Sequence, residues 1–101
     1  MLDISITAEE LLKMRQINPG LKLLDVREEF ELEEIPLLDG AVHVPLGDIS
    51  VQALLDVGID KKDQFVVYCH SGNRSKVACQ VLYCQDYLNV KDLDGGIETQ
   101  L

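Results

Sequence analysis

The sequence predicts an α/β fold: a three-layer α/β/α sandwich whose central sheet is mostly parallel and has about five strands. Strand-like and helix-like segments alternate along the whole chain. Segment 64–69, QFVVYC, is apolar without interruption, which is typical of a strand covered on both faces of a parallel sheet. With 101 residues, 47% of them hydrophobic, the chain can bury a core of its own. We therefore expect one domain that spans residues 1–101.

The first part of the chain predicts a short strand followed by a capped helix. DISI at 3–6 alternates like a strand, and Thr7 and Glu10 have the spacing of a capping box, which starts a helix. The sequence NPG at 18–20 ends that helix. Its apolar stripe is expected to be Leu11, Leu12 and Met14.

The middle of the chain predicts two strands and a second helix. Segment 21–26 is a buried strand, and the charged segment 27–34 is a loop or a helical turn. Segment 41–45, AVHVP, alternates like a strand and is closed by its proline. A helix follows, with Asp48 as its expected N-cap and Gly58 at its end.

The last part of the chain predicts a helix, a strand and a final turn. The apolar strand 64–69 leads through a polar loop into a helix over 75–88, followed by a strand at 90–93 and a helical turn at 95–101. The core face of the long helix is expected to be Val77, Ala78, Val81, Leu82 and Leu88.

Composition and charge exclude several classes of function. A net charge of −9 argues against nucleic acid and anionic membranes as partners. No apolar run approaches the roughly 18 residues of a membrane helix, and the N-terminus lacks the basic region of a secretory signal. Three irregularly spaced cysteines indicate a reducing compartment and no disulfide framework. We expect a cytoplasmic protein.

The segment CHSGNRS, residues 69–75, is the strongest candidate for a functional site. Ligands of open parallel sheets bind beyond the carboxyl ends of the strands, and both Cys69 and the DVR sequence at 25–27 fall at such ends. A thiol has a pKa near 8.5 and reacts as the thiolate. Amides and the dipole of a following helix favour the thiolate, and Arg74 and Lys76 add positive charge. Cys69 is therefore the expected nucleophile.

The residues after Cys69 have the composition of an anion-binding loop. Gly72 permits a positive φ, and Asn73 tolerates the left-handed region. A loop curled in this way turns its N–H groups inward and forms a cradle for one anionic group. Ser71 and Ser75 can add hydroxyl donors.

Four motifs, in this order along the chain, resemble those of the rhodanese family of sulfurtransferases. LLDVREEFELEE (23–34) is similar to that family's strand-and-loop motif, and DGAVHVPLGDI (39–49) is similar to its next segment. CHSGNRS (69–75) resembles its active-site loop, and DLDGGIE (92–98) resembles its closing glycine pair. The likeness covers roughly residues 5–98.

The resemblance implies covalent catalysis at Cys69. Its sulfur would attack a donor such as thiosulfate, become a persulfide and pass the outer sulfur to a thiol or protein acceptor. The loop, comprising His70, Ser71, Gly72, Asn73, Arg74 and Ser75, would hold the sulfur, with Arg74 on the donor's anionic group. Asp25 and Arg27 are expected to form an ion pair that supports the loop, or Arg27 to touch the donor. No metal or organic cofactor is implied.

Two alternatives stay open. Phosphatases and arsenate reductases of the same fold place five residues between cysteine and arginine, whereas here there are four, a smaller ring that suits one sulfur atom. A non-catalytic interaction module of the same fold would not need both Cys69 and Arg74. Among other residues, His70 is expected to tune the loop or contact a partner, and His43 to be a hydrogen-bonded core residue. Cys79 is a less favoured resolving thiol.

Overall fold

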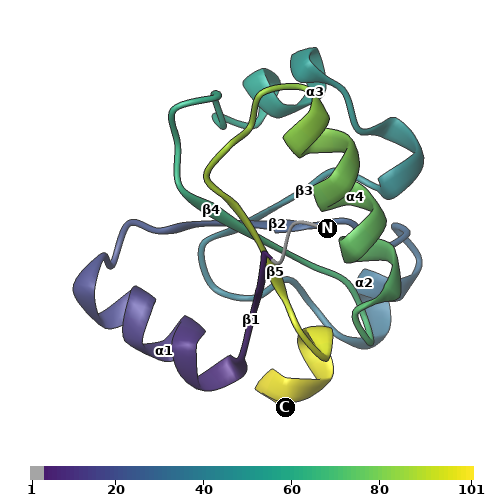
Figure 1. Cartoon of the computed structure of the whole chain (residues 1–101). Coiled ribbons are helices and arrows are strands. Elements are labelled where there is room, and N and C mark those ends of the chain that lie inside the picture. The colour runs from purple at the N-terminus through teal and green to yellow at the C-terminus, as the bar shows by residue number, and fades with distance from the viewer. Residues whose placement is uncertain (1–3) are drawn as a thin grey trace.

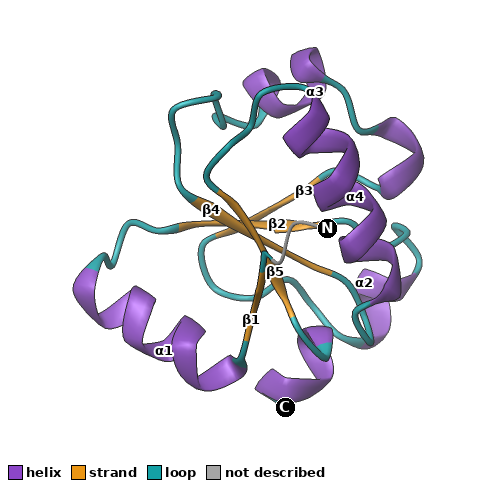
Figure 2. Cartoon of the chain, viewed as in Figure 1, coloured by secondary structure: helices purple, strands orange, loops and turns teal. Residues whose placement is uncertain are grey.

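The protein is a twisted five-stranded sheet covered by helices on both faces, as seen in a computed structural model that describes residues 4–101 (Figures 1 and 2). All strand pairs are parallel, in the order β1-β5-β4-β2-β3. The predicted α/β sandwich is confirmed. The strands are β1 (Ser5–Ile6), β2 (Lys22–Asp25), β3 (Ala41–His43), β4 (Phe65–Tyr68) and β5 (Val90–Leu93). The helices are α1 (Ala8–Ile17), α2 (Glu31–Glu34), α3 (Val51–Asp56), α4 (Asn73–Cys84) and the 3₁₀ turns η1 (Leu46–Asp48) and η2 (Gly96–Gln100).

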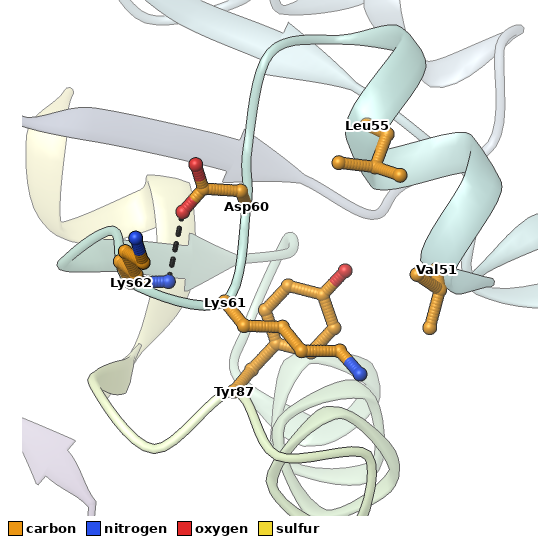
Figure 3. A pocket seen from close by; sticks show the side chains of 6 residues that line it. All are labelled: Val51, Leu55, Asp60, Lys61, Lys62 and Tyr87. Carbon is orange, nitrogen blue, oxygen red and sulfur yellow. Dashed lines mark hydrogen bonds between the residues drawn. The ribbon is translucent and has the colours of Figure 1, made fainter.

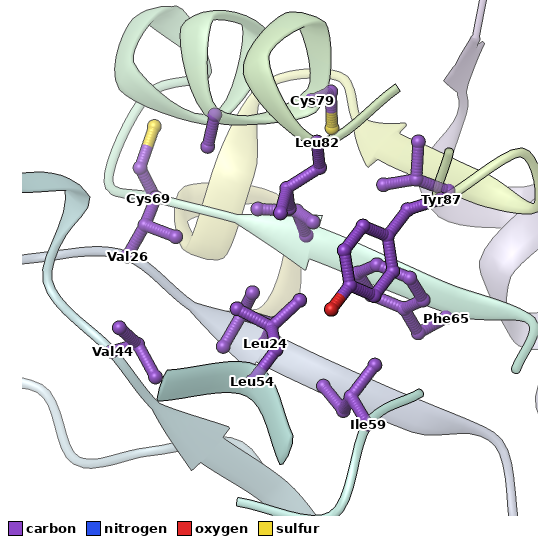
Figure 4. Close-up of a cluster of buried hydrophobic side chains, with 13 residues drawn as sticks. Leu24, Val26, Val44, Leu54, Ile59, Phe65, Cys69, Cys79, Leu82 and Tyr87 are labelled. Atoms are coloured by element: carbon purple, nitrogen blue, oxygen red, sulfur yellow. The ribbon is translucent and has the colours of Figure 1, made fainter. Parts of the chain in front are cut away.

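Each face of the sheet has its own hydrophobic core. On one face, alternate residues of β4 pack with Leu54 of α3 and Leu82 of α4, and Phe65 meets Tyr87 edge to face at 5.9 Å (Figure 4). On the other face, Leu11 of α1 and Ile97 of η2 pack against the sheet. Figure 1 shows α1 and the C-terminal turn on the side away from α3 and α4. Because the central strands are buried on both faces, they read as continuous apolar runs.

The helix starts follow local capping chemistry. The capping box at α1 is confirmed: the Glu10 amide donates to the Thr7 hydroxyl at 3.1 Å, and the Thr7 amide donates to the Glu10 carboxylate at 3.1 Å. The predicted cap of α3 is wrong. Asp48 lies in η1, and Ser50 caps α3 by accepting from the Ala53 amide at 3.0 Å. The chain makes a 3₁₀ turn first, which moves the helix start by two residues.

The core face of α4 differs from the prediction. Val77, Val81 and Leu88 are 50%, 40% and 58% exposed, whereas Ala78 and Leu82 are buried as expected. The buried face also includes Ser75 and Cys79. Ser75 contacts the sulfur of Cys69 at the end of β4, on the same helix face as Ala78, Cys79 and Leu82. Leu88 lies beyond the helix, which ends at Cys84.

The topology places the predicted site at one edge of the sheet. Asp25, the last residue of β2, pairs with Tyr68, the last residue of β4, so the two carboxyl ends are adjacent. The segment 69–72 that follows β4 leads directly into α4. Within residues 4–101, none of the helices combines the length and apolar character that crossing a bilayer requires.

Candidate active site

The sulfur of Cys69 lies at the base of a loop that directs amide groups towards it. The Gly72 amide donates to Sγ at 3.1 Å and the Ser75 amide at 3.4 Å. Cys69 is 1% exposed and follows β4 directly, on the face covered by α4. Amide donors stabilise a negative charge on the sulfur better than a neutral thiol. The local surroundings of Sγ are thus polar, although the residue belongs to a hydrophobic core.

The loop takes its shape from Gly72 and Ser75. Gly72 has a φ of 113°, a left-handed conformation that a residue with a side chain rarely adopts, and it is the N-cap of α4. The Ser75 hydroxyl donates to the Gly72 carbonyl at 3.1 Å and lies 3.5 Å from Sγ. Among the described residues, no acceptor binds the amides of Asn73 and Arg74 in the first helical turn. These two donors are free to bind a ligand.

The turn η2 supports the loop from behind. The Ile97 amide donates to the Cys69 carbonyl at 2.8 Å, and the Glu98 amide to the His70 carbonyl at 3.3 Å. A Cβ at Gly96 would lie 2.5 Å from both carbonyl oxygens, and Gly96 has a φ of 64°. Only glycine fits there without moving the loop, which gives a physical reason for the glycine pair at 95–96.

Arg74 is held by a carboxylate that the sequence did not single out. Its Nη1 and Nη2 bind Oε2 and Oε1 of Glu31 at 2.6 and 2.7 Å, a bidentate pair. The hydrogen bonds from Arg74 are the main reason why the pKa of Glu31 falls to about 2, against a burial that would raise it. The charged segment 27–34 was expected to be a loop or a helical turn. Its residue Glu31 lies in α2 and faces the loop.

Asp25 and Arg27 form a buried ion pair. Arg27 binds Asp25 Oδ2 through Nε at 2.9 Å and Nη2 at 2.7 Å, and both side chains are almost fully buried. Burial alone would lower the pKa of Arg27, but the bonds and charge of Asp25 outweigh it and raise the pKa. Arg27 also reaches the Glu31 and Pro36 carbonyls at 3.5 Å, and His43 Nε2 bonds to its carbonyl at 2.6 Å. The pair thus braces the segment that carries Glu31.

The other predicted loop residues face outward. The imidazole of His70 is 47% exposed and lies 3.4 Å from Glu98, and Ser71 and Asn73 are also exposed. His70 therefore faces solvent and Glu98, as expected for a side chain of a loop that turns amides inward. The side chains of Ser71 and Asn73 make no hydrogen bond within residues 4–101, so only their backbone belongs to the cradle.

The expected surplus of positive charge around the loop is not present. Lys76 binds Asp92 Oδ2 at 2.8 Å and lies 3.5 Å from Asp94, which raises the pKa of the lysine.

Cys79 is buried, and burial raises the pKa of its thiol. Cys84 is exposed. A buried thiol held in the protonated form is a poor candidate for a resolving cysteine.

Outside the loop, the described part of the chain offers no metal site but does contain a pocket. No group of His, Cys, Asp or Glu side chains in the described part of the chain could hold a metal ion. A pocket of about 320 Å³ lies between α3, the 60–62 turn and Tyr87, before the strands β4 and β5 (Figure 3). It contains none of the predicted site residues. The buried Tyr87 hydroxyl has no hydrogen-bond partner within residues 4–101.

Two residues that hold the loop, Glu31 and Gly96, were not predicted to do so from the sequence. Glu31 lies within the charged segment 27–34. Its partner Arg74 lies 43 residues later in the chain, so spacing within the segment gave no signal of the pairing. Gly96 was noted only as part of a motif, because its contacts with the loop carbonyls depend on the fold.

Known proteins resemble the chain in both sequence and fold. The family model of the rhodanese-like domain matches residues 7–99. The putative sulfurtransferase YtwF of Bacillus subtilis is 33% identical over 92 residues, which are 91% of this chain and 84% of YtwF. YrkF, a putative sulfur carrier protein of the same bacterium, is 35% identical over 80 residues, but these are 77% of this chain and only 40% of YrkF. A rhodanese-related protein from Thermoplasma volcanium matches with a TM-score of 0.75 at 28% identity, over 94% of this chain and 87% of that one. Relatives with these names support a role in sulfur transfer.

Proposed function

Because this chain belongs to the family of rhodanese-like domains, we propose that it is a sulfurtransferase that works through a persulfide on Cys69. One observation supports this most directly: Sγ accepts the amides of Gly72 and Ser75 at the start of α4, while two further amides of that turn are free. An ionised sulfur and a cradle for a second sulfur atom are what persulfide chemistry requires.

The reaction proceeds in two displacements. The Cys69 thiolate attacks the outer sulfur of a donor, the donor's sulfur–sulfur bond breaks, and the leaving group departs with the bonding electrons. The amides of Asn73 and Arg74 bind the new terminal sulfur of the persulfide. A thiophilic acceptor then attacks that sulfur and restores the Cys69 thiolate. The chemistry uses only the cysteine and the loop, without a metal or an organic cofactor.

The donor is thiosulfate or the persulfide of a thiol or protein, and the acceptor is a thiol or a protein. The names of YtwF and YrkF specify no donor, so the choice of donor is part of this proposal. Cys69 is 1% exposed, and a donor must therefore offer a single sulfur atom at the mouth of the loop. That requirement fits a sulfane sulfur, which ends its molecule, better than a phosphoryl group with three oxygens.

Intact-mass measurement after mixing with a sulfur donor tests the proposal. The protein is incubated separately with thiosulfate and with cysteine persulfide, and its mass is followed before and after cyanide. We expect a gain of one sulfur atom from at least one donor, and its loss to cyanide as thiocyanate. Peptide mapping should place the added sulfur on Cys69.

Two serine variants provide the controls. Cys69→Ser should take up no sulfur that cyanide removes, whereas Cys84→Ser, which replaces an exposed thiol outside the loop, should behave as the unchanged protein. Cyanide-removable sulfur on Cys69→Ser, or its absence from the unchanged protein with both donors, would contradict the assignment. Release of phosphate from an aryl phosphate would favour the phosphatase alternative.

A further inference from the structure

The charge state of Arg74 determines which donor suits the loop. Segment 69–76 contributes two cations beyond His70, and both are paired: Arg74 with Glu31, and Lys76 with Asp92. Arg74 is bound through both of its terminal nitrogens, at 2.6 and 2.7 Å. An anionic donor would therefore meet a guanidinium whose charge is already matched by a carboxylate.

Glu31 is fixed in place by its own segment. Its Oε2 also accepts the Glu28 amide at 2.7 Å, and its carbonyl lies 3.5 Å from the guanidinium of the buried Arg27. Only 19% of the Glu31 side chain is exposed. Because a backbone amide already holds the Glu31 carboxylate, the side chain loses little conformational entropy when it pairs with Arg74. A flexible surface side chain would lose more. The pKa of about 2 keeps it ionised throughout the neutral range.

We propose that Glu31 is a specificity-determining residue: by neutralising Arg74, it disfavours dianionic donors such as thiosulfate and favours a monoanionic or neutral persulfide. The proposal rests on the proposed sulfurtransferase function and names its donor class. Thiosulfate brings two negative charges to a thiolate in a chain with a net charge of −9. A persulfide R–S–S⁻ brings one.

Both donors give the same product, the persulfide of Cys69. Thiosulfate reacts as Cys69–S⁻ + S–SO₃²⁻ → Cys69–S–S⁻ + SO₃²⁻, with sulfite as the leaving group. The persulfide reacts as Cys69–S⁻ + R–S–S⁻ → Cys69–S–S⁻ + R–S⁻, with a thiolate leaving. Neither step needs an oxidant or a reductant. The difference lies in the charge of the donor and leaving group, to which a free Arg74 would respond.

Rate constants of persulfide formation on four proteins test the idea. Quenched samples analysed by intact mass give the second-order rate constant with thiosulfate and with cysteine persulfide. For the unchanged protein we expect the persulfide to react at least about tenfold faster. Glu31→Gln should raise the thiosulfate rate constant about tenfold, because it frees one positive charge, and change the persulfide rate constant less than about threefold.

Matched variants separate the contact from the overall charge. Glu33→Gln removes the same charge from the same helix, but the side chain of Glu33 is exposed and has no bonding partner within residues 4–101. This variant should change neither rate constant more than about twofold. Glu31→Gln with Arg74→Gln should lose the gain. An equal effect of the Glu31 and Glu33 variants, or a gain that survives in the double variant, would overturn the proposal.

The unchanged protein provides a test that needs no variant. If Glu31→Gln failed to fold, as checked by thermal denaturation, a thiosulfate rate constant equal to or above that of cysteine persulfide in the unchanged protein would still refute the inference. Failure of the function itself would look different: no sulfur would be added to Cys69 from either donor.

Discussion

At the scale of single residues, the reactivity of the site depends on what surrounds one sulfur atom. Cys69 is as buried as a core residue, yet two amides and one hydroxyl lie within 3.5 Å of Sγ. The hydroxyl belongs to Ser75, which donates to the Gly72 carbonyl. Ser75 therefore connects the two ends of the loop and can turn its proton towards a charged sulfur.

Ser75→Ala should slow persulfide formation without unfolding the protein. The variant keeps the amide of residue 75 on Sγ but removes the hydroxyl, and it leaves the Gly72 carbonyl without its donor. A hydrogen bond of this kind contributes about 1 kcal/mol, so we expect a loss of roughly fivefold in the rate constant. The measurement is single-turnover mass analysis with cysteine persulfide. An unchanged rate constant, with an unchanged melting temperature, would show that the hydroxyl has no part in the chemistry.

At the scale of elements, the nucleophile is held between a helix start and a 3₁₀ turn. The first turn of α4 provides amides in front of Sγ, and η2 binds the carbonyls of residues 69 and 70 from behind. A cradle that exposes N–H groups must turn its carbonyls the other way, and these need donors of their own. The turn η2 provides them, so the end of the chain contributes to the site without touching the sulfur.

Gly96→Ala should therefore disrupt the loop from a distance. The new methyl group would lie 2.5 Å from the Cys69 and His70 carbonyl oxygens, at a φ of 64°. We expect a loss of more than about 2 kcal/mol in the free energy of unfolding, measured with urea, and a slower persulfide reaction. Gly47→Ala is the control, since a Cβ there meets nothing within 4 Å; its change should stay within about 1 kcal/mol. Equal stability of the two variants would argue against a tight fit at Gly96.

Helix rotation shows where sequence reasoning succeeds and where it ends. Apolar spacing and capping residues predicted the five strands and the helices α1, α3 and α4, because these signals are local, as at Thr7 and Glu10. They missed the 3₁₀ turn η1 and therefore the N-cap of α3. The same apolar spacing chose the wrong face of α4, because hydrophobicity ranks Val77 above Ser75, whereas in the fold Ser75 is buried against Cys69 and Val77 is half exposed. The pairing of Glu31 with Arg74 spans 43 residues and could not be read from spacing within one segment.

At the scale of the whole molecule, negative charge opposes the approach of anionic donors. Eighteen acidic residues against nine basic ones give a net charge of −9. The short-range dipoles of the loop act only once a donor has arrived, whereas the overall field acts on its approach. Because Arg74 and Lys76 are paired, no local surplus of positive charge offsets this field at the loop. Salt should then assist the reaction by screening the repulsion.

The rate constant with thiosulfate should rise with ionic strength. Between about 10 mM and about 150 mM salt the Debye length falls from about 30 to about 8 Å, which screens the distant carboxylates from the donor. We expect a rise of several-fold for the dianion and a smaller rise for cysteine persulfide, because the interaction scales with the donor's charge. The measurement is the second-order rate of sulfur uptake at constant pH, with sodium chloride as the salt. A rate constant that falls as salt is added would mean that a local positive potential dominates at the loop, which would require Arg74 to be free of Glu31 in solution.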